Sequence, residues 1–357
     1  MKKQVVFGVG PNFERNKEYL PDIDYFVDND NTKHRSFYMD KEIRSFEDLL
    51  LETADIHLII TLSNPLVIEN QLNLLSMRKN IEISSLSKYL STKDVSEPKV
   101  SILIPTYNRE SIIEETIKSA LDQNYSNFEI IVNDNNSEDK TYEVLCNLQR
   151  ENSIINIDKN KENVGAFKNW YECIKKASGE YCKILFSDDL ISKDYLKLTT
   201  PYLRNNDVGF VTSKVIIGEK PFVGEESYCL FPLEGTFSKR DYYMKVLFEK
   251  YQRTSLVSPG AALFRTKDVK EVMEYILENN QWEKYLEKGA GVDLLIYLCI
   301  STKYSKIAFV NKNLCFFRAH PESITIADKN RELNEHYLDI KKFFVKNKNI
   351  TEYLLSE

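Results

Sequence analysis

Two adjacent carboxylates, Asp188 and Asp189, follow the apolar run 184–186 after the single residue Ser187. A buried strand is expected to end where its side chains become ionic, because an isolated charge is unstable in an apolar interior. We therefore expect both aspartates at the carboxyl end of a central strand, the edge at which open α/β sheets bind ligands. Carboxylates side by side repel unless a cation lies between them, and such oxygen ligands suit Mg²⁺ or Mn²⁺ with substrate phosphates. The alternative is a helix N-cap, for which Asp is also well suited.

Polar loops follow further predicted strands in the same part of the chain. The apolar runs 100–104, 128–132 and 154–157 each end in polar residues. The carboxyl ends of parallel strands meet at one edge of a sheet, so these loops are expected to line the same crevice as the two aspartates. The sequence thus predicts a binding site there. The residues that the first two loops bring to it are Thr106, Tyr107, Asn108, Arg109 and Asp134.

Helical patterns alternate with these strands. Ile113, Ile117, Ala120 and Leu121 recur at the spacing of one helix face. A second helix is expected from about 167 to 177. Strands that alternate with helices predict an α/β unit built on a parallel sheet.

Residues 1–92 are predicted to form a smaller, Rossmann-like α/β domain with strands at the apolar runs 5–10, 23–28 and 56–61. The first run leads into a GxG turn, but the third glycine of a dinucleotide-binding fingerprint is missing. One interpretation is a nucleotide or sugar site with Asp28 on a ribose. The interpretation we favour is a scaffold that binds no ligand tightly.

The 357 residues exceed one average domain. The polar, proline-containing segment 93–98 is the predicted linker, residues 99–325 the main domain and 326–357 a helical C-terminal segment. A net charge of −6 argues against a nucleic-acid partner. Six cysteines without CxxC spacing are typical of a reducing compartment.

The sequence predicts a cytoplasmic protein, because the N-terminus lacks a secretory apolar core and no apolar run reaches about 18 residues. Near the C-terminus, Tyr337, Ile340, Phe343 and Phe344 form an apolar stripe on a charged helical pattern. We expect this stripe to pack on the protein. The lysines of the same segment leave a peripheral contact with an anionic membrane surface open.

Several short motifs occur in a fixed order, and together they resemble the family 2, GT-A fold, inverting glycosyltransferases over roughly residues 99–325. The resemblance implies a doubly wound mixed sheet, a nucleotide-sugar donor, a divalent metal and a single displacement with inversion, as in a hexosyltransferase. The motifs are the Pro105–Arg109 loop, Asp134 with the Ser137–Thr141 turn, Asn163-Val164-Gly165, Ala177–Tyr181 and Ser187-Asp188-Asp189.

The resemblance implies that the loop from Pro105 to Arg109 wraps the nucleoside, with Thr106 and Tyr107 near base and ribose. Asp134 matches the carboxylate that reads the N3–H of uracil. A carboxylate accepts from an imide N–H, which cytosine lacks, so Asp134 favours UDP or dTDP. The further nucleotide-binding residues that the resemblance implies are Asn108, Asn135, Asn163 and Asp188.

Asp188 and Asp189 match the family's DXD-type metal and ribose site, although Phe186 stands where a further Asp is common. His320 is implied to reach the metal, Mn²⁺ or Mg²⁺, or the diphosphate. Arg318 and Ser323 match possible phosphate contacts in the family's closing segment. Residues 258–265 resemble its acceptor-side segment.

Asp293 precedes an apolar helix and sits where an N-cap belongs. The family places its general base at this point, commonly after Glu, where this chain has Val292. A cap carboxylate at a pocket edge is fixed in position, so Asp293 is compatible with both roles. The aromatic segment 218–240, predicted to be a loop, is either a wall of the acceptor site or a cover for the core.

We predict an inverting, metal-dependent glycosyltransferase that acts on a hydroxyl of a surface-glycan or lipid-linked glycan acceptor. A rival is a nucleotide-sugar-binding module without turnover. Another is an oxidoreductase or epimerase that works through residues 1–90, which the missing third glycine disfavours.

Overall fold

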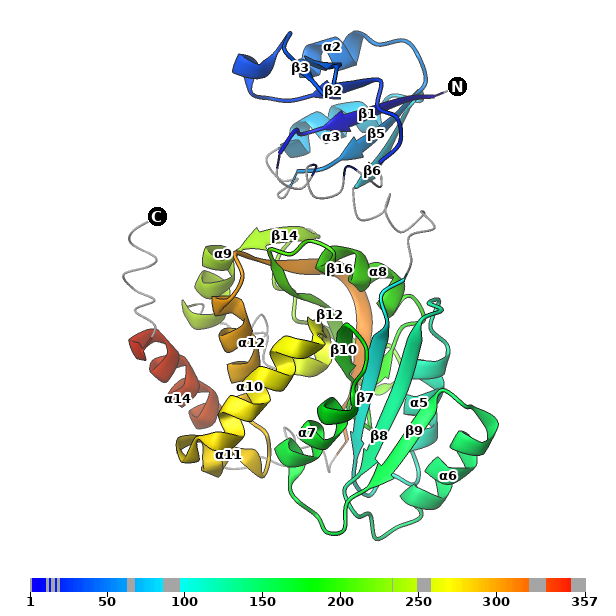
Figure 1. Cartoon of the computed structure of the whole chain (residues 1–357), viewed down its shortest axis with the longest axis vertical. Helices are drawn as coiled ribbons and strands as arrows, with labels where there is room; N and C mark the ends of the chain where they lie inside the picture. The colour runs from blue at the N-terminus through cyan, green and yellow to red at the C-terminus, as the bar shows by residue number, and fades with distance from the viewer. Residues whose placement is uncertain are drawn as a thin grey trace. The chain divides into compact units, whose positions relative to one another are not determined.

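The computed structural model describes residues 2–10, 13, 17, 20–62, 68–85, 97–232, 234–248, 258–320 and 332–347. The chain divides into two compact units, Met1–Ser96 and Glu97–Glu357. Each is an α/β unit with its own sheet (Figure 1).

The N-terminal unit is built on a sheet of order β3-β4-β2-β1-β5-β6, in which every neighbouring pair except β3–β4 is parallel. The strands expected from the first three apolar runs are present, whereas β3, β4 and β6 were not predicted. Apolar clusters cover both faces of the sheet. The elements are β1 (Lys3–Phe7), β2 (Tyr25–Val27), β3 (Phe37–Tyr38), β4 (Lys41–Arg44), α2 (Phe46–Leu51), β5 (Ile56–Ile60), α3 (Glu69–Ser76) and β6 (Ile81–Ser85).

The carboxylate of Asp28 is bound within the N-terminal unit. It accepts the backbone N–H groups of Val9 at 3.2 Å and Asp30 at 2.9 Å, and the Lys33 ammonium lies at 3.2 Å. These bonds tie the glycine turn after β1 to the end of β2. They give Asp28 a structural role, which favours the scaffold interpretation of this unit.

The C-terminal unit is built on a mixed sheet of order β11-β16-β12-β15-β10-β7-β8-β9, with β13 paired to β12 and β14 to β16. Strands β10, β7, β8 and β9 are parallel to one another. Helices α5 and α6 cover one face of this parallel part and α7 the other (Figure 1), as right-handed crossovers require. The fold therefore agrees with the predicted doubly wound mixed α/β sheet.

The first half of the C-terminal unit consists of β7 (Val100–Thr106), α5 (Ile113–Leu121), β8 (Phe128–Asp134), α6 (Thr141–Glu151), β9 (Ile155–Lys159), α7 (Ala166–Lys176), β10 (Tyr181–Ile184), β11 (Leu190–Ile191) and α8 (Tyr195–Leu203). The second half consists of β12 (Val208–Lys220), β13 (Val223–Ser227), β14 (Gly235–Ser238), α9 (Lys239–Tyr243), β15 (Ala262–Arg265), α10 (Thr266–Glu278), α11 (Glu283–Leu286), α12 (Val292–Thr302), β16 (Lys306–Arg318) and α14 (Glu332–Asn347).

One prediction about the sheet was wrong, and several strands were not predicted. Residues 218–240 are not simply a loop, since β12 runs to Lys220 and forms a hairpin with β13, and β14 follows. Strand β10 ends at Ile184, before the aspartates, and β16 was not predicted as a strand at all. In β12–β13 the exposed face carries glycines and charged residues, so the hairpin shows little of the apolar alternation that predicts a strand.

The apolar stripe of α14 packs on the protein as expected, with Ile340 and Phe344 fully buried. Among the described residues, no helix is long and apolar enough to cross a membrane.

Gly179 lies where β10 begins against β7. An added Cβ would lie 2.6 Å from the Ser101 nitrogen and 2.8 Å from the Lys99 oxygen, both of which are fixed backbone atoms. We expect Gly179→Ala to destabilise the protein by roughly 1–3 kcal/mol, the usual cost of overpacking. Urea unfolding measures this loss. Gly10→Ala, which adds its Cβ in open space, is the control, and equal midpoints for the two variants would contradict the packing described.

Candidate functional site

The loops after β7 and β8 lie at one edge of the sheet. Thr106 pairs with Asp134 in the parallel β7–β8 ladder, so the two strands end side by side. Leu185 continues alongside β7 by donating its N–H to the Leu103 carbonyl at 2.8 Å. The segment that leads to Asp188 therefore reaches the same edge.

Asp134 is fully buried, with 0% of its surface exposed. Its carboxylate accepts the Ser137 N–H at 3.1 Å and the Ser137 hydroxyl, and the Lys159 ammonium lies at 3.5 Å. The carboxylate thus holds the turn after β8 in place. The predicted contact between Asp134 and the N3–H of uracil is not available in this arrangement, because no part of the side chain is exposed to a ligand.

The loop after β7 is fixed by the turn after β8. Asn108 adopts a positive φ of 51°, donates its N–H to the Ser137 hydroxyl at 2.9 Å and accepts the Glu138 N–H at 3.0 Å. Pro105 lies within β7, and Thr106 is buried. Of the predicted loop residues, Tyr107, Asn108 and Arg109 are therefore the ones that present partly exposed side chains.

Asn135 and Asn163 belong to a network of amides beside this edge. The Asn135 amide donates to the Asn163 side-chain oxygen at 2.7 Å and accepts the Val164 N–H at 3.0 Å. Asn169 on α7, which was not predicted, joins the network through Asn160 at 3.0 Å. These side chains bind one another, so their role in this arrangement is to shape the loops.

Asp188 is the centre of a charged cluster. Its Oδ2 lies 2.9 Å from His320 Nε2 and 3.5 Å from an Arg109 guanidinium nitrogen. The Arg318 guanidinium also donates to the Asp188 carbonyl at 3.1 Å. His320 is 132 residues away in sequence, and β16 carries it to the cluster. The Asp188 and His320 side chains are 17% and 19% exposed, so this pair is partly accessible to solvent.

Asp189 is nearly buried behind Asp188. Its Oδ1 accepts the Arg318 backbone N–H at 3.1 Å. Burial raises the pKa of Asp189 well above its usual range, and the Asp188 charge raises it further. The helix-cap interpretation was wrong, because both aspartates lie in the turn between β10 and β11.

The donor set at Asp188 fits a divalent cation with few protein ligands. Among the residues that the structure describes, no group of three or more His, Cys, Asp and Glu side chains is arranged to hold a metal, so the predicted set of Asp188, Asp189 and His320 is not assembled. Asp188 and His320 alone bring an oxygen and a nitrogen within contact distance. Mg²⁺ and Mn²⁺ sites that use one or two carboxylates are completed by substrate phosphates. Ser323 lies outside the described residues.

Asp293 lies in the first turn of α12, with Gly291 at the N-cap, so the predicted N-cap position was wrong. Its Oδ1 accepts the N–H groups of Gly291 at 2.8 Å and Leu294 at 2.7 Å. Its Oδ2 accepts the Tyr337 hydroxyl at 2.8 Å. Burial raises the pKa of Asp293 to about 7, against the opposing effect of these hydrogen bonds. A carboxylate with a pKa near neutrality can exchange a proton under physiological conditions.

Lys183 binds the acceptor-side segment, residues 258–265, through the Gly260 carbonyl. This fully buried lysine donates to the Gly260 carbonyl and lies 3.5 Å from the Cys315 sulfur. Phe186, which stands where an Asp is common in the resembled family, packs on Trp170 with ring centroids 5.1 Å apart. Position 186 therefore serves packing in this chain.

Lys183 was not predicted as a site residue, since a lone lysine in an apolar strand forms no recognisable motif.

Residues 101–273 match glycosyl transferase family 2. This segment is a family 2 glycosyltransferase domain. The domain accounts for the order in which the loops, Asp188 and the acceptor-side segment occur. Asp293 and His320 lie beyond the matched residues.

Curated relatives resemble the glycosyltransferase domain. The GalNAc(5)-diNAcBac-PP-undecaprenol beta-1,3-glucosyltransferase of Campylobacter jejuni is 39% identical over 149 residues, which are 41% of this chain and 48% of that protein. A putative teichuronic acid biosynthesis glycosyltransferase of Bacillus subtilis is 32% identical over 32% of this chain and 45% of its own. The abequosyltransferase RfbV of Salmonella typhimurium is 37% identical over 29% of this chain and 32% of its own. This chain spans less than half the length of each.

A solved structure shares the fold. TarS residues 1–349 from S. aureus, in complex with UDP-GlcNAc, superimposes with a TM-score of 0.53 at 19% identity. The superposition covers 70% of this chain and 67% of that chain. At this identity the likeness establishes a GT-A type of fold and nothing finer.

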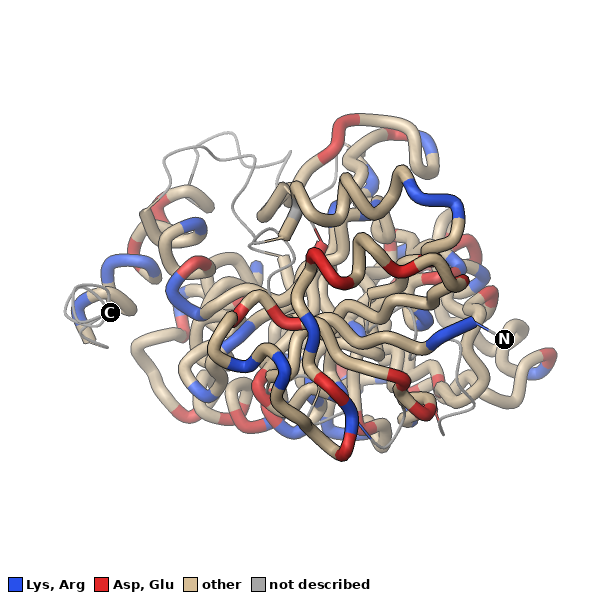
Figure 2. Tube along the Cα trace, turned by 90° about the horizontal axis from the view of Figure 1, so that it is seen from above, with Lys and Arg blue, Asp and Glu red and all other residues tan. Residues whose placement is uncertain are grey.

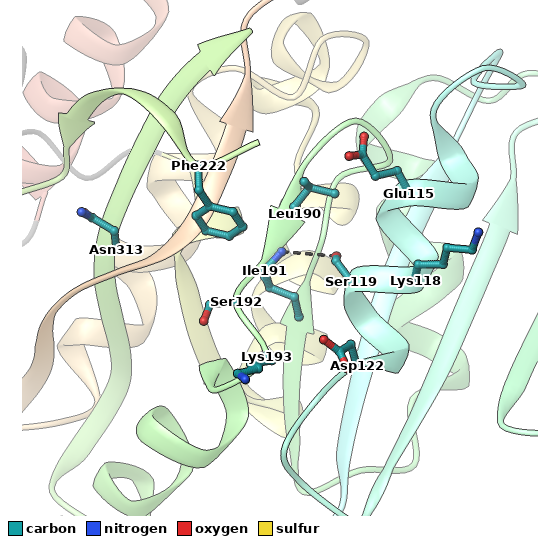
Figure 3. A pocket seen from close by; sticks show the side chains of 10 residues that line it. All are labelled: Glu115, Lys118, Ser119, Asp122, Leu190, Ile191, Ser192, Lys193, Phe222 and Asn313. Carbon is teal, nitrogen blue, oxygen red and sulfur yellow. Dashed lines mark hydrogen bonds between the residues drawn. The ribbon is translucent and has the colours of Figure 1, made fainter. Parts of the chain in front are cut away.

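A pocket of about 560 Å³ lies beside this site (Figure 3). Leu190, which directly follows Asp189, lines this pocket. So does Phe222 of the aromatic segment 218–240, whereas none of the predicted donor-site residues does. Its wall combines the Phe222 ring with carboxylate, ammonium and hydroxyl groups from α5 and from the residues that follow β11. Basic and acidic residues are interspersed along the chain (Figure 2). The net charge of the whole chain is −6.

Proposed function

We propose that the protein transfers a sugar from a nucleoside-diphosphate sugar to a hydroxyl group of a glycan acceptor, with inversion. The observation that carries the proposal is the cluster of Asp188, His320 and Arg109 at the carboxyl edge of a family 2 domain. It combines a metal-binding pair with a cation beside it, which is a suitable environment for a diphosphate. Asp293 adds a carboxylate of near-neutral pKa in the same unit.

In the proposed reaction Asp293 takes the proton of the acceptor hydroxyl. The freed oxygen forms a bond to the anomeric carbon while the bond from that carbon to the diphosphate breaks, and its electron pair leaves with the nucleoside diphosphate. In this proposal Arg109 and Arg318, which both contact Asp188, stabilise the negative charge of the leaving group. A divalent ion at Asp188 and His320 would neutralise part of the same charge.

The donor that we propose is UDP-linked, although the burial of Asp134 removes the direct argument for uracil. Support comes from the domain's family and from a GT-A relative whose structure holds UDP-GlcNAc. Tyr107 and Asn108 present the partly exposed side chains of the loop that would contact the nucleoside. Calorimetry with UDP, dTDP, GDP and CDP in the presence of Mn²⁺ tests this proposal. UDP is expected to bind tightest, and failure of all four to bind would overturn the donor site.

The acceptor that we propose is a lipid-linked or polymeric surface glycan. The names of the relatives include an undecaprenol-linked oligosaccharide and teichuronic acid biosynthesis. An acceptor of this kind is anchored at a membrane, so we also propose peripheral action at the cytoplasmic face.

Deleting residues 1–96 is expected to leave the affinity for UDP within a few-fold of the parent value. Every residue of the proposed site lies in the C-terminal unit, and Asp28 is already bound within its own unit. Calorimetry on the truncated and full-length proteins gives the comparison. A folded truncation that no longer binds UDP would show that the N-terminal unit contributes to the donor site.

A further inference from the structure

The two oxygens of Asp293 are in different environments. Oδ1 accepts two backbone N–H groups, from Gly291 and Leu294, whereas within the described part of the chain Oδ2 accepts the Tyr337 hydroxyl alone. Each carboxylate oxygen has about two lone pairs. Oδ1 is therefore fully engaged, and Oδ2 keeps one lone pair for a proton.

Tyr337 comes from α14, and this helix is held firmly over the start of α12. An added Cβ at Gly291 would lie 3.3 Å from the Ile340 side chain, so that side chain packs closely against the start of α12. Phe343 meets Trp282 edge to face, with ring centroids 4.7 Å apart, and His336 meets Tyr285 in the same way at 4.9 Å. Aromatic pairs of this geometry stabilise the packing beyond the burial of their surfaces. They fix where the Tyr337 hydroxyl lies.

We infer that Tyr337 is a positioning residue for transfer, because its hydroxyl holds Asp293 so that the remaining lone pair of Oδ2 receives the acceptor proton. The C-terminal helix thereby becomes part of the active site although it lies beyond the matched domain. The inference rests on the proposed function, in which Asp293 is the base.

The groups around Asp293 keep Tyr337 protonated, so that its hydroxyl donates a hydrogen bond to Asp293 throughout the titration of Asp293. Among the described residues, the titratable groups that interact with Asp293 are Tyr337 from α14 and Tyr228 between β13 and β14, whereas His336 and Tyr285 lie beside Gly291. Burial raises the pKa of both Tyr337 and Tyr228, and the Asp293 charge raises them further. Tyr337 thus keeps its proton over the range in which Asp293 titrates, and its hydroxyl stabilises the carboxylate form.

The test is the pH dependence of transfer by full-length Tyr337→Phe. Loss of a hydrogen bond to the charged form raises the pKa of Asp293, so the acidic limb of the kcat/KM profile is expected to move up by about one pH unit. Transfer at pH 7 should fall about fivefold and recover at higher pH, because the deprotonated fraction of Asp293 falls from about one half to about one tenth. UDP affinity should stay at the parent value, because the donor contacts lie elsewhere.

Tyr285→Phe is the matched control, since it removes a hydroxyl that donates to Asp339 of the same helix at 3.3 Å without touching Asp293. A purely structural role for Tyr337 would give both variants the same profile as the parent, and that result would overturn the inference.

A second measurement keeps the inference separate from the proposed function. The carboxyl carbon of Asp293, assigned by its loss in Asp293→Asn, is titrated by carbon-13 NMR in the parent and in Tyr337→Phe. An unchanged pKa overturns the inference whether or not transfer is found. If the pKa of Asp293 differs between the parent and Tyr337→Phe but the parent shows no transfer, the contact between Tyr337 and Asp293 is supported. The proposed function is then rejected.

Discussion

Asp293→Asn is expected to lower the transfer rate by a factor of about 10² to 10⁴, the usual effect of removing a general base. Asn keeps the shape of Asp and can still accept the backbone N–H groups of Gly291 and Leu294. UDP affinity should therefore remain at the parent value, because Asp188 and the loop after β7 are unchanged. The measurement is steady-state transfer together with calorimetry of UDP.

The same substitution has a predictable effect on stability. The pKa of Asp293 is raised to about 7 in the folded protein, so the folded state binds its proton more tightly than the unfolded state. The stability that this group contributes is present below its unfolded pKa and is lost as the pH rises towards 7. The stability of Asp293→Asn should therefore decline less than that of the parent as the pH rises. Melting curves from pH 4 to pH 8 measure this difference.

Asp268→Asn provides the control for Asp293→Asn. Asp268 is also a buried aspartate that accepts a tyrosine hydroxyl, from Tyr304 at 2.5 Å, but it pairs with Lys303 as well. Its replacement should lower the melting temperature and leave the transfer rate of the folded protein intact. If Asp293→Asn behaves in the same way, Asp293 stabilises the helix start and another carboxylate is the base.

Asp188→Asn is expected to abolish the Mn²⁺ dependence of UDP binding and to lower transfer by about 10² to 10³. The change removes the charged oxygen that lies 2.9 Å from His320, and metal stabilisation of a leaving group is worth several kcal/mol. Calorimetry of UDP with and without Mn²⁺ gives the binding effect directly.

Asp194→Asn is the matched control for Asp188→Asn, because Asp194 contacts Asn124 at 2.6 Å and has no part in the cluster. It should leave both binding and transfer unchanged. If Asp188→Asn responds to Mn²⁺ as the parent does, Asp188 is not a metal ligand.

The place of the site was predictable from the sequence, whereas its internal contacts were not. An apolar run that ends in Asp188 and Asp189 indicates a strand end, and the β7–β8 register brings the Asp134 loop to the same edge. The direction in which each polar side chain of a loop points depends on tertiary contacts. Asp134 turns inward to Ser137 for this reason, and no pattern in the sequence distinguishes it from an exposed aspartate.

Contacts between distant segments were the hardest to predict. His320 was expected near the metal only through the family resemblance, because 132 residues separate it from Asp188. Tyr337 was interpreted as part of a packing stripe, and that is correct for its neighbours Ile340 and Phe344. A hydroxyl at the edge of such a stripe gives no sign in the sequence that it meets a carboxylate on another helix.

The most direct test of the central claim is acceptor-dependent release of UDP from a panel of UDP-sugars with Mn²⁺. The assay compares lipid-linked and polymeric glycan acceptors with a control that lacks acceptor. The account predicts release from at least one donor that requires an acceptor and that Asp188→Asn and Asp293→Asn both suppress. Tight binding of UDP-sugars without release from any of them would contradict it, and would identify the protein as a nucleotide-sugar-binding module without turnover.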